Sequence, residues 1–257
     1  SANTLNATWT PPTGYSGTAT HTLTTTGMAP CGAATSTVNI TVRPTPTASI
    51  SGTTTVCQNA TSPNITFTNP MGLPVTVTYN INGSNQTTIN IAANSTATVG
   101  TPTGSAGTFT YNLVSVVYQS APTCSNGISG SATVTVTLTP TASINYSGTP
   151  FCKSVSTAQA VTLSGTGAYT GGTYSASPSG LTINTSTGAI TPISSTAGTY
   201  TVTYTIPASG GCASVPVTTS VTIVALPTAN AGTAQTICQG AAATLNGSVG
   251  GSATRSE

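Results

Sequence analysis

The six cysteines of this chain carry its most reactive side chains. Cysteines form structural disulfides, bind metal ions or remain as reduced residues of a core. A metal site is the weakest of these alternatives, because the sequence has no Cys-x-x-Cys pair and its single histidine is His21. The sequence therefore favours disulfides that form in an oxidising compartment.

The cysteines repeat along the chain in two series with the same period. The first series has spacings of 95 and 86 residues and consists of Cys57, Cys152 and Cys238. The second has spacings of 93 and 88 residues and consists of Cys31, Cys124 and Cys212. The tripeptide Pro-Thr-Ala recurs with a similar period, at residues 46–48, 140–142 and 227–229. These markers predict a repeating unit of about 90 residues.

The elements that position these cysteines are predicted to be β-strands. Residues 132–138 alternate apolar side chains with threonine, which is the pattern of a half-buried strand. Residues 36–42 and 215–223 alternate in the same way, so each unit closes with a strand. Turn signals such as Asn82-Gly83 separate shorter β-branched runs, and no helical period appears. The sequence predicts an all-β chain of tandem immunoglobulin-like sandwiches with about seven strands each.

The repeats divide the chain into two complete and two partial units. Residues 45–140 and 141–227 each form a complete repeat, residues 1–44 the C-terminal half of one, and residues 228–257 the N-terminal part of another. A half sandwich exposes its core face to water. We therefore expect the polypeptide to continue beyond both ends. The alternative is head-to-tail assembly, in which Cys238 of one chain meets Cys31 of the next.

Within a unit, the first cysteine follows the opening strands and the second precedes the closing strand. Pairing Cys57 with Cys124, and Cys152 with Cys212, closes loops of 67 and 60 residues. In the chain-entropy description of disulfides, each of these bonds stabilises the folded state by about 4 kcal/mol. Cys31 and Cys238 are then unpaired within this segment, and their partners are expected outside it.

Charged side chains are almost absent: 3 Lys and Arg, one Glu and no Asp in 257 residues. Paired carboxylates and a Ser-His-Asp triad are therefore excluded, and we predict that the chain is not an enzyme. It is expected to bind no cofactor and no metal. Three scattered cations cannot form the basic stripe that binds nucleic acid, and no apolar run is long enough to insert into a membrane.

Two further residues are candidates for chemistry. His21 acts as a general base only beside an activated nucleophile and an orienting acid, so an exposed or half-buried strand position is the favoured interpretation. Lys153 follows Cys152 and lowers the pKa of its thiol if that thiol is free, but the sequence favours a disulfide there.

Asparagine, tyrosine and threonine suggest three surface roles that the sequence does not favour. Ten sequons would accept glycans in a eukaryotic host: Asn6, Asn39, Asn59, Asn64, Asn82, Asn85, Asn94, Asn145, Asn184 and Asn246. Eight aromatic side chains are candidates for stacking on sugar rings, although a sandwich core is the favoured place for most of them: Trp9, Tyr79, Tyr111, Tyr118, Tyr169, Tyr174, Tyr200 and Tyr204. The Thr-x-Thr runs would suit an ice-binding solenoid only if they recurred at every short coil.

Several segments resemble the PKD-like and immunoglobulin-like tandem repeats of very large secreted proteins of gliding Bacteroidota. Residues 47–60 and 107–116 are especially similar to repeats of the giant flavobacterial gliding-motility adhesin. Residues 180–190 and 198–202 resemble immunoglobulin-like or cadherin-like domains. The resemblance implies export by the type IX system, a location outside the cell at its surface, and a role as an adhesin or filament.

The favoured function is a non-catalytic stalk or adhesive segment of a long extracellular adhesin or filament, with a role in gliding motility. Its expected partners are neighbouring repeats of the same chain, sister chains in a filament or bundle, and a surface or polysaccharide ligand. The alternative is an array of carbohydrate-binding modules in a secreted polysaccharide-degrading protein.

Overall fold

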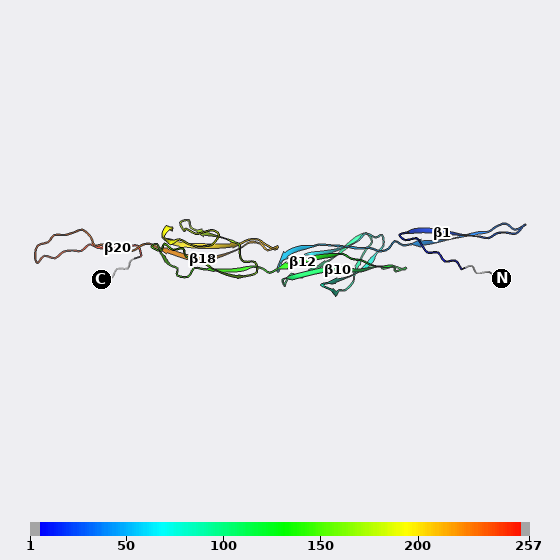
Figure 1. Ribbon diagram of the computed structural model, residues 1–257, viewed down its shortest axis with the longest axis horizontal. Helices are drawn as coiled ribbons and strands as arrows, with labels where there is room; N and C mark the ends of the chain where they lie inside the picture. Colours follow the sequence, from blue (N-terminus) through cyan, green and yellow to red (C-terminus); the bar gives the residue numbers. More distant parts are fainter. Residues whose placement is uncertain (1–5, 253–257) are drawn as a thin grey trace. The chain divides into compact units, whose positions relative to one another are not determined.

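The computed structural model describes residues 6–252, and nearly all of their regular secondary structure is β-strand (Figure 1). Within these residues the other regular element is a single 3-10 turn, η1 (Pro192–Ser194). The predicted all-β class is confirmed. No helix in this part of the chain is long and apolar enough to cross a membrane.

The chain divides into two compact units. The first consists of Ser1–Thr54, Thr61–Pro102 and Thr108–Thr135, and the second of Thr55–Ala60, Thr103–Gly107 and Val136–Glu257. The short segment Thr55–Ala60 thus belongs to the second unit, although it precedes most of the first. The repeat boundaries after residues 44, 140 and 227 stay a prediction.

The first unit begins with a two-stranded hairpin of β1 (Gly17–Thr24) and β2 (Thr35–Val42). Gly17 lies opposite Val42, and His21 lies opposite Val38. Because successive side chains of a strand point to opposite faces, Val38, Ile40 and Val42 share one face of the hairpin, and His21 lies on the same face.

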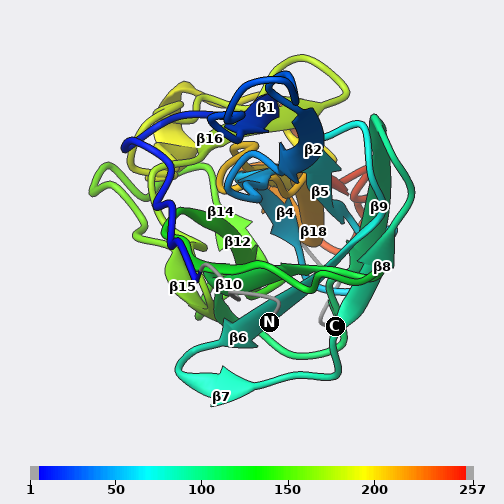
Figure 2. The ribbon, with the colours of Figure 1, turned by 90° about the vertical axis from the view of Figure 1, so that its right-hand side faces the viewer.

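Two sheets follow along the chain. The three-stranded sheet has the order β3 (Ser49–Ser51), β5 (Asn64–Asn69), β9 (Ser95–Gly100). The larger sheet has the order β4 (Thr54–Cys57), β12 (Ser131–Thr137), β10 (Gly107–Tyr118), β6 (Val75–Ile81), β7 (Ser84–Asn85). In it β8 (Ile89–Ile91) also pairs with β6, and β11 (Ser125–Gly127) pairs with β10. Figure 2 shows β6 beside β10, its antiparallel neighbour.

Where apolar and polar residues alternate in the sequence, buried and half-buried side chains alternate in the structure. In β12, Ala132, Val134 and Val136 are buried, whereas the threonines between them are half-buried. Leu138 continues the sequence pattern but lies beyond the strand and is 47% exposed. Between the two sheets, the rings of Phe67 and Tyr79 lie 4.8 Å apart and form part of the buried core.

The next pair of sheets lies in the second unit. One sheet consists of β13 (Thr141–Asn145) and β15 (Thr162–Thr166). The other has the order β14 (Phe151–Cys152), β18 (Val215–Val224), β17 (Gly198–Ile206), β16 (Thr173–Ser177). A single buried cluster fills the space between them: Ile144, Tyr146, Phe151, Tyr174, Ile190, Tyr200, Val202, Tyr204, Ile206, Val221 and Ile223. Beyond it, β19 (Thr228–Asn230) and β20 (Ser248–Gly250) form a last hairpin.

A short strand runs beside the closing strand in each of the two larger sheets. The backbone N–H of Gln58 donates to the carbonyl of Thr137 at 2.8 Å, at the end of β12. The backbone N–H of Lys153 donates to the carbonyl of Val224 at 3.0 Å, at the end of β18. Cys57 and Cys152, the residues just before these donors, therefore occupy equivalent places in their sheets.

Candidate functional site

The cysteines predicted to carry the chemistry form one disulfide in the described part of the chain, between Cys57 and Cys212. Cys57 ends β4, and Cys212 lies in the connection between β17 and β18. Their Cα atoms are 4.6 Å apart, although 155 residues separate them in sequence. Both belong to the second compact unit. The remaining cysteines are thiols: Cys31, Cys124, Cys152 and Cys238.

Threonine side chains lie against both sulfur atoms of this disulfide. Thr139 Oγ1 lies 3.5 Å from Cys57 Sγ, and Thr137 Oγ1 lies 3.4 Å from Cys212 Sγ. Thr137 Oγ1 also donates to the carbonyl of Val56 at 3.1 Å. These contacts fix the chain on both sides of the bridge.

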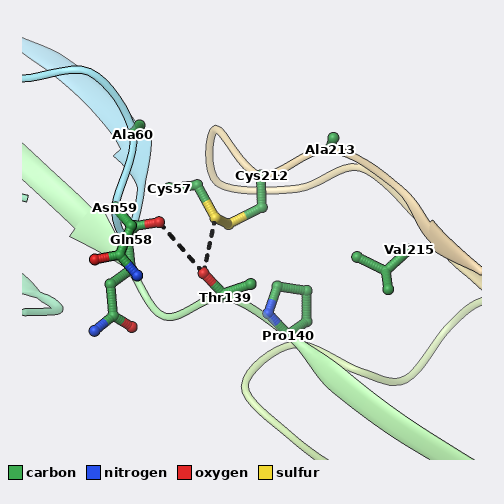
Figure 3. A pocket seen from close by; sticks show the side chains of 9 residues that line it. All are labelled: Cys57, Gln58, Asn59, Ala60, Thr139, Pro140, Cys212, Ala213 and Val215. Carbon is green, nitrogen blue, oxygen red and sulfur yellow. Dashed lines mark hydrogen bonds between the residues drawn. A yellow bond between two sulfur atoms is a disulfide. The ribbon is translucent and has the colours of Figure 1, made fainter. Parts of the chain in front are cut away.

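A shallow hollow of about 320 Å³ opens beside the bridge (Figure 3). It is lined by residues of the second unit: Cys57, Gln58, Asn59, Ala60, Thr139, Pro140, Cys212, Ala213 and Val215. None of these lining side chains is ionisable, because both cysteines are bonded in the disulfide. Nor do the described residues contain a group of three or more His, Cys, Asp or Glu side chains that would hold a metal ion. The arrangement suits a structural joint.

Backbone and side-chain hydrogen bonds anchor the segment around Cys57. The N–H of Asn59 donates to the carbonyl of Thr103 at 2.9 Å, and Thr103 Oγ1 donates to the carbonyl of Ala60 at 2.6 Å. Gln58 Nε2 donates to the carbonyl of Gly104 at 2.8 Å. The segment Thr55–Ala60 is therefore held within one compact unit by these hydrogen bonds and by the disulfide between Cys57 and Cys212.

The predicted pairing of Cys57 with Cys124 is wrong in this structure, because the two residues lie at opposite ends of one sheet. Cys57 lies level with the end of β12, next to the start of the antiparallel strand β10. The carbonyl of Cys124 accepts from the N–H of Tyr118, the last residue of β10. β10 has 12 residues, so it separates the two cysteines by about 35 Å.

The predicted pairing of Cys152 with Cys212 fails for the same reason. Cys152 pairs with Val224 at the end of β18, whereas Cys212 precedes Val215 at its beginning. A strand of 10 residues spans about 30 Å, and disulfides require Cα atoms within about 7 Å. Of the four cysteines predicted to be bonded, Cys57 and Cys212 are bonded to each other, and Cys124 and Cys152 are thiols. Spacing along the sequence could not measure this distance.

Cys152 is a thiol whose pKa lies below its ordinary value. The main cause is the hydroxyl of Ser154, which donates to Cys152 Sγ at 3.2 Å and stabilises the thiolate. The backbone N–H groups of Ser154 and Lys153 lower the pKa further, while burial opposes them. The side-chain ammonium of Lys153, which the sequence suggested as the cause, is not among these groups.

We expect Ser154→Ala to raise the pKa of Cys152 and to move its alkylation by iodoacetamide to higher pH. The thiolate is the reactive form, so removal of the hydroxyl donor leaves less thiolate at any given pH below the midpoint. Mass spectrometry of the Cys152 peptide over a pH series measures the midpoint. Lys153→Gln and Ser156→Ala are the controls and should leave it in place, and a larger shift with Lys153→Gln would contradict the assignment.

Most of the aromatic candidates for sugar stacking lie in the cores. The buried ones are Tyr79, Tyr111, Tyr118, Tyr174, Tyr200 and Tyr204. Tyr200 donates its hydroxyl to the carbonyl of Thr196 at 2.7 Å, four residues upstream, as in a tyrosine corner. Tyr169 is half-buried. The favoured core interpretation is confirmed for the six buried side chains.

A small aromatic cluster remains near the hairpin of the first unit. Trp9 is 37% exposed, and its ring lies 6.0 Å from that of Tyr15 and 4.7 Å from that of His21. His21 is half-buried in β1, as expected, and its Nε2 has no hydrogen-bond partner. Sequence reasoning did not single out Tyr15, which is 36% exposed.

Three of the sequon asparagines serve local backbone structure. Asn59, Asn82 and Asn94 have φ values of 64°, 50° and 49°, in the left-handed region that asparagine tolerates in turns. Asn82 also donates to the carbonyl of Thr108 at 2.9 Å and accepts from the N–H of Thr110 at 2.8 Å. Turn geometry explains these residues without glycans.

No known protein family matches the chain, and no curated protein matches it. Solved structures with a similar arrangement include the C-terminal 282-residue fragment of intimin in complex with the intimin-binding domain of its translocated receptor. That match has 17% identity and a TM-score of 0.39, and it covers 72% of this chain and 65% of the fragment. A Ca²⁺-stabilised adhesin that helps an Antarctic bacterium bind ice has 18% identity and a TM-score of 0.37 over 84% of this chain and 60% of the adhesin.

A third similar structure is a SusE-like surface polysaccharide-binding protein of Bacteroides thetaiotaomicron. It has 15% identity and a TM-score of 0.26 over 73% of this chain and 36% of that protein. This chain thus spans less than two thirds of each of these proteins. The neighbours are bacterial adhesins and surface proteins, but the likeness is too low to carry a function from them to this chain.

Proposed function

We propose that this chain is a non-catalytic stalk segment of a long extracellular adhesin at the cell surface. The observation that carries the proposal is the disulfide between Cys57 and Cys212, which closes 155 residues of chain into a covalent loop. Force applied to the ends of the chain passes through the sulfur atoms and bypasses the strands inside the loop. A stalk that holds an adhesive tip away from a cell needs such resistance to tension.

The sequence chemistry supports a structural role. The described residues contain two Lys or Arg side chains, Arg43 and Lys153, and no Asp or Glu. The guanidinium of Arg43 donates to the carbonyls of Ser120 and Ala121, both at 2.8 Å, and lies 5.8 Å from the ring centre of Tyr118. Its charge therefore holds a loop in place. Hydroxyl and amide groups hydrate the rest of the surface, and their hydration depends little on salt.

The finer form of the proposal comes from the resemblance to giant Bacteroidota repeats. Residues 47–60 and 107–116 support export by the type IX system, a part in gliding motility, and assembly with sister chains into filaments or bundles. In this proposal the neighbours of each repeat are other repeats, and any surface or polysaccharide ligand binds elsewhere on the long protein.

The second candidate is a carbohydrate-binding module, which the exposed pair of Trp9 and Tyr15 favours. Exposed aromatic rings stack on the apolar faces of sugars. On a glycan array, we expect the full chain to show no saturable binding, because the other large aromatic side chains are mostly buried.

Two variants make this test specific. Trp9→Ala removes the exposed ring, and Leu245→Ala changes an exposed apolar side chain of the last hairpin. Saturable binding of a defined sugar that is lost in Trp9→Ala and kept in Leu245→Ala would replace the stalk proposal with the carbohydrate-binding one.

A further inference from the structure

The bond between Cys57 and Cys212 joins the two cysteine series across predicted repeats. Cys57 is an early cysteine, from the first series, and Cys212 is a late cysteine, from the second. Cys57 passes over Cys124, the late cysteine of its own predicted repeat, which is 67 residues away. It bonds with the late cysteine of the following predicted repeat, and the contacts around this bond recur elsewhere in the chain.

The loop that carries Cys212 rests on the end of a closing strand. Thr137, the last residue of β12, donates its hydroxyl to the carbonyl of Gly210 in this loop. Cys212 Sγ lies 3.9 Å from the carbonyl oxygen of Leu138, the next residue along the chain. These contacts hold Cys212 beside the closing strand, where it meets Cys57.

The loop that carries Cys124 rests on an equivalent strand end. Arg43 stands 94 residues before Thr137, which is the spacing of the first two Pro-Thr-Ala segments. Its guanidinium donates to the carbonyl of Ser120 in this loop at 2.8 Å. Arg43 therefore holds its loop as Thr137 holds the loop of Cys212.

A second contact places Cys124 at the same strand end. Pro44 stands 94 residues before Leu138. The carbonyl of Pro44 accepts from the hydroxyl of Tyr118, and the carbonyl of Cys124 accepts from the backbone N–H of Tyr118, both at 3.1 Å. An early cysteine 94 residues before Cys57 would stand beside this strand end, and that position lies outside these 257 residues.

Cys152 opens the same turn as Cys57, beside the next closing strand. The carbonyl of Cys57 accepts from the N–H of Ala60 at 3.1 Å, and that of Cys152 accepts from the N–H of Val155 at 3.0 Å. The two turns begin beside the last residues of β12 and β18. Cys152 therefore has the local structure of a bonded cysteine, although Cys212 lies at the other end of β18.

We propose that each early cysteine of the long chain is bonded to the late cysteine of the following repeat, as Cys57 is bonded to Cys212. This inference rests on the proposed function, because it requires one continuous chain of repeats. Each bond then spans about 155 residues. The thiols of this segment are bonded to cysteines of flanking repeats: Cys152 and Cys238 to late cysteines that follow the segment, Cys31 and Cys124 to early cysteines that precede it.

Bonds of this kind overlap along the chain and limit how far the stalk can be stretched. The bond from Cys238 begins 26 residues after the bond from Cys57 ends at Cys212. Tension crosses one bridge, follows these 26 residues, about 90 Å when extended, and crosses the next bridge. After reduction, the 181 residues from Cys57 to Cys238 extend to about 600 Å. The pairing thus prevents the stalk from unravelling under load.

Each bond forms by thiol–disulfide exchange with a disulfide oxidant in an oxidising compartment. One cysteine thiolate attacks the oxidant, forms a mixed disulfide and releases one thiolate of the oxidant. The second cysteine thiolate attacks the cysteine sulfur of the mixed disulfide and releases the other thiolate. The cysteine pair loses two protons and two electrons, and the oxidant gains them and becomes two thiols.

A peptide map of the native protein tests the pairing and needs no variant to fold. Free thiols are blocked with N-ethylmaleimide without reduction, and pepsin digests the protein at low pH, where disulfides do not exchange for lack of thiolate. We expect no blocked cysteine, and we expect Cys124 and Cys152 each linked to a peptide from outside these 257 residues. A blocked Cys124 or Cys152, or a bond between the two, would overturn the proposal. The isolated segment is the control, and its four thiols should all be blocked.

Serine variants of the long chain test each bond by the thiol that it leaves behind. Cys152→Ser should expose one new thiol about 155 residues later, and Cys124→Ser should expose one about 155 residues earlier. Cys57→Ser is the matched control and should expose Cys212. A newly exposed Cys212 in Cys152→Ser would show pairing within one repeat and refute the proposal.

Gels with and without reductant separate a failure of this pairing from a failure of the stalk proposal. A long single chain with a blocked Cys152 refutes the pairing and leaves the stalk proposal in place. A native protein that divides into short chains on reduction refutes both, because the outside partners then belong to separate polypeptides. One long chain before and after reduction, with Cys124 and Cys152 bonded as described, supports both.

Discussion

Pulled from its two ends without reductant, this chain is expected to extend by about 500 Å less than it does after reduction. The disulfide between Cys57 and Cys212 spans 155 residues, and an extended residue contributes roughly 3.3–3.6 Å. Strands inside the loop can unfold, but their unfolding adds no length while the sulfur bridge holds. Force spectroscopy of the single chain, with and without a reducing agent, measures the difference.

Three serine variants test whether the disulfide between Cys57 and Cys212 causes the shorter extension without reductant. Cys57→Ser should release the full length without reductant, whereas Cys124→Ser and Cys152→Ser should behave like the unaltered chain. If Cys57 were bonded to Cys124 instead, Cys57→Ser and Cys124→Ser would each release the same 67 residues, about 230 Å. That result would remove the main support for the stalk proposal.

Tyr204→Ala is expected to lower the free energy of unfolding of the second sandwich by about 4 kcal/mol. Tyr204 is 1% exposed, and its ring lies 4.7 Å from that of Tyr174 in the buried cluster. Its hydroxyl accepts from the N–H of Gly172 at 2.9 Å and donates to the carbonyl of Tyr169 at 2.8 Å. The substitution leaves a cavity and two backbone groups without their partner.

Hydrogen exchange of β17 peptides in increasing denaturant measures this loss, because it reports on one sandwich of a chain with two units. Tyr204→Phe keeps the ring and should cost about 1–2 kcal/mol, through the unpaired N–H and carbonyl. Tyr15→Ala changes a tyrosine that is 36% exposed and should leave the β17 peptides unaffected. Equal hydrogen-exchange protection of the β17 peptides in Tyr204→Ala and Tyr15→Ala would contradict the assignment of Tyr204 to the core.

Sequence alone predicted the class of fold because strand burial has a period of two residues, which is a local property. Residues 132–138 show it: the threonines stay at the surface side of β12, and the valines enter the core. Tyr200 and Tyr204 followed the same rule, since they alternate with threonines in β17. The amino-acid composition also needs no structure to be interpreted. The chain has no aspartate and a single glutamate, and this alone limits the acid–base chemistry that its side chains can perform.

The partners of the cysteines depended on tertiary structure. Their two series were visible in the sequence, but spacing along the chain does not give distance across a sheet. The two cysteines of one predicted repeat lie at opposite ends of long strands, because the early one ends a short strand beside the end of the closing strand. Cys57 is therefore near the late cysteine of the following predicted repeat and far from that of its own. Only the lengths and directions of β10, β12, β17 and β18, which long-range backbone pairing sets, decide which sulfur atoms meet.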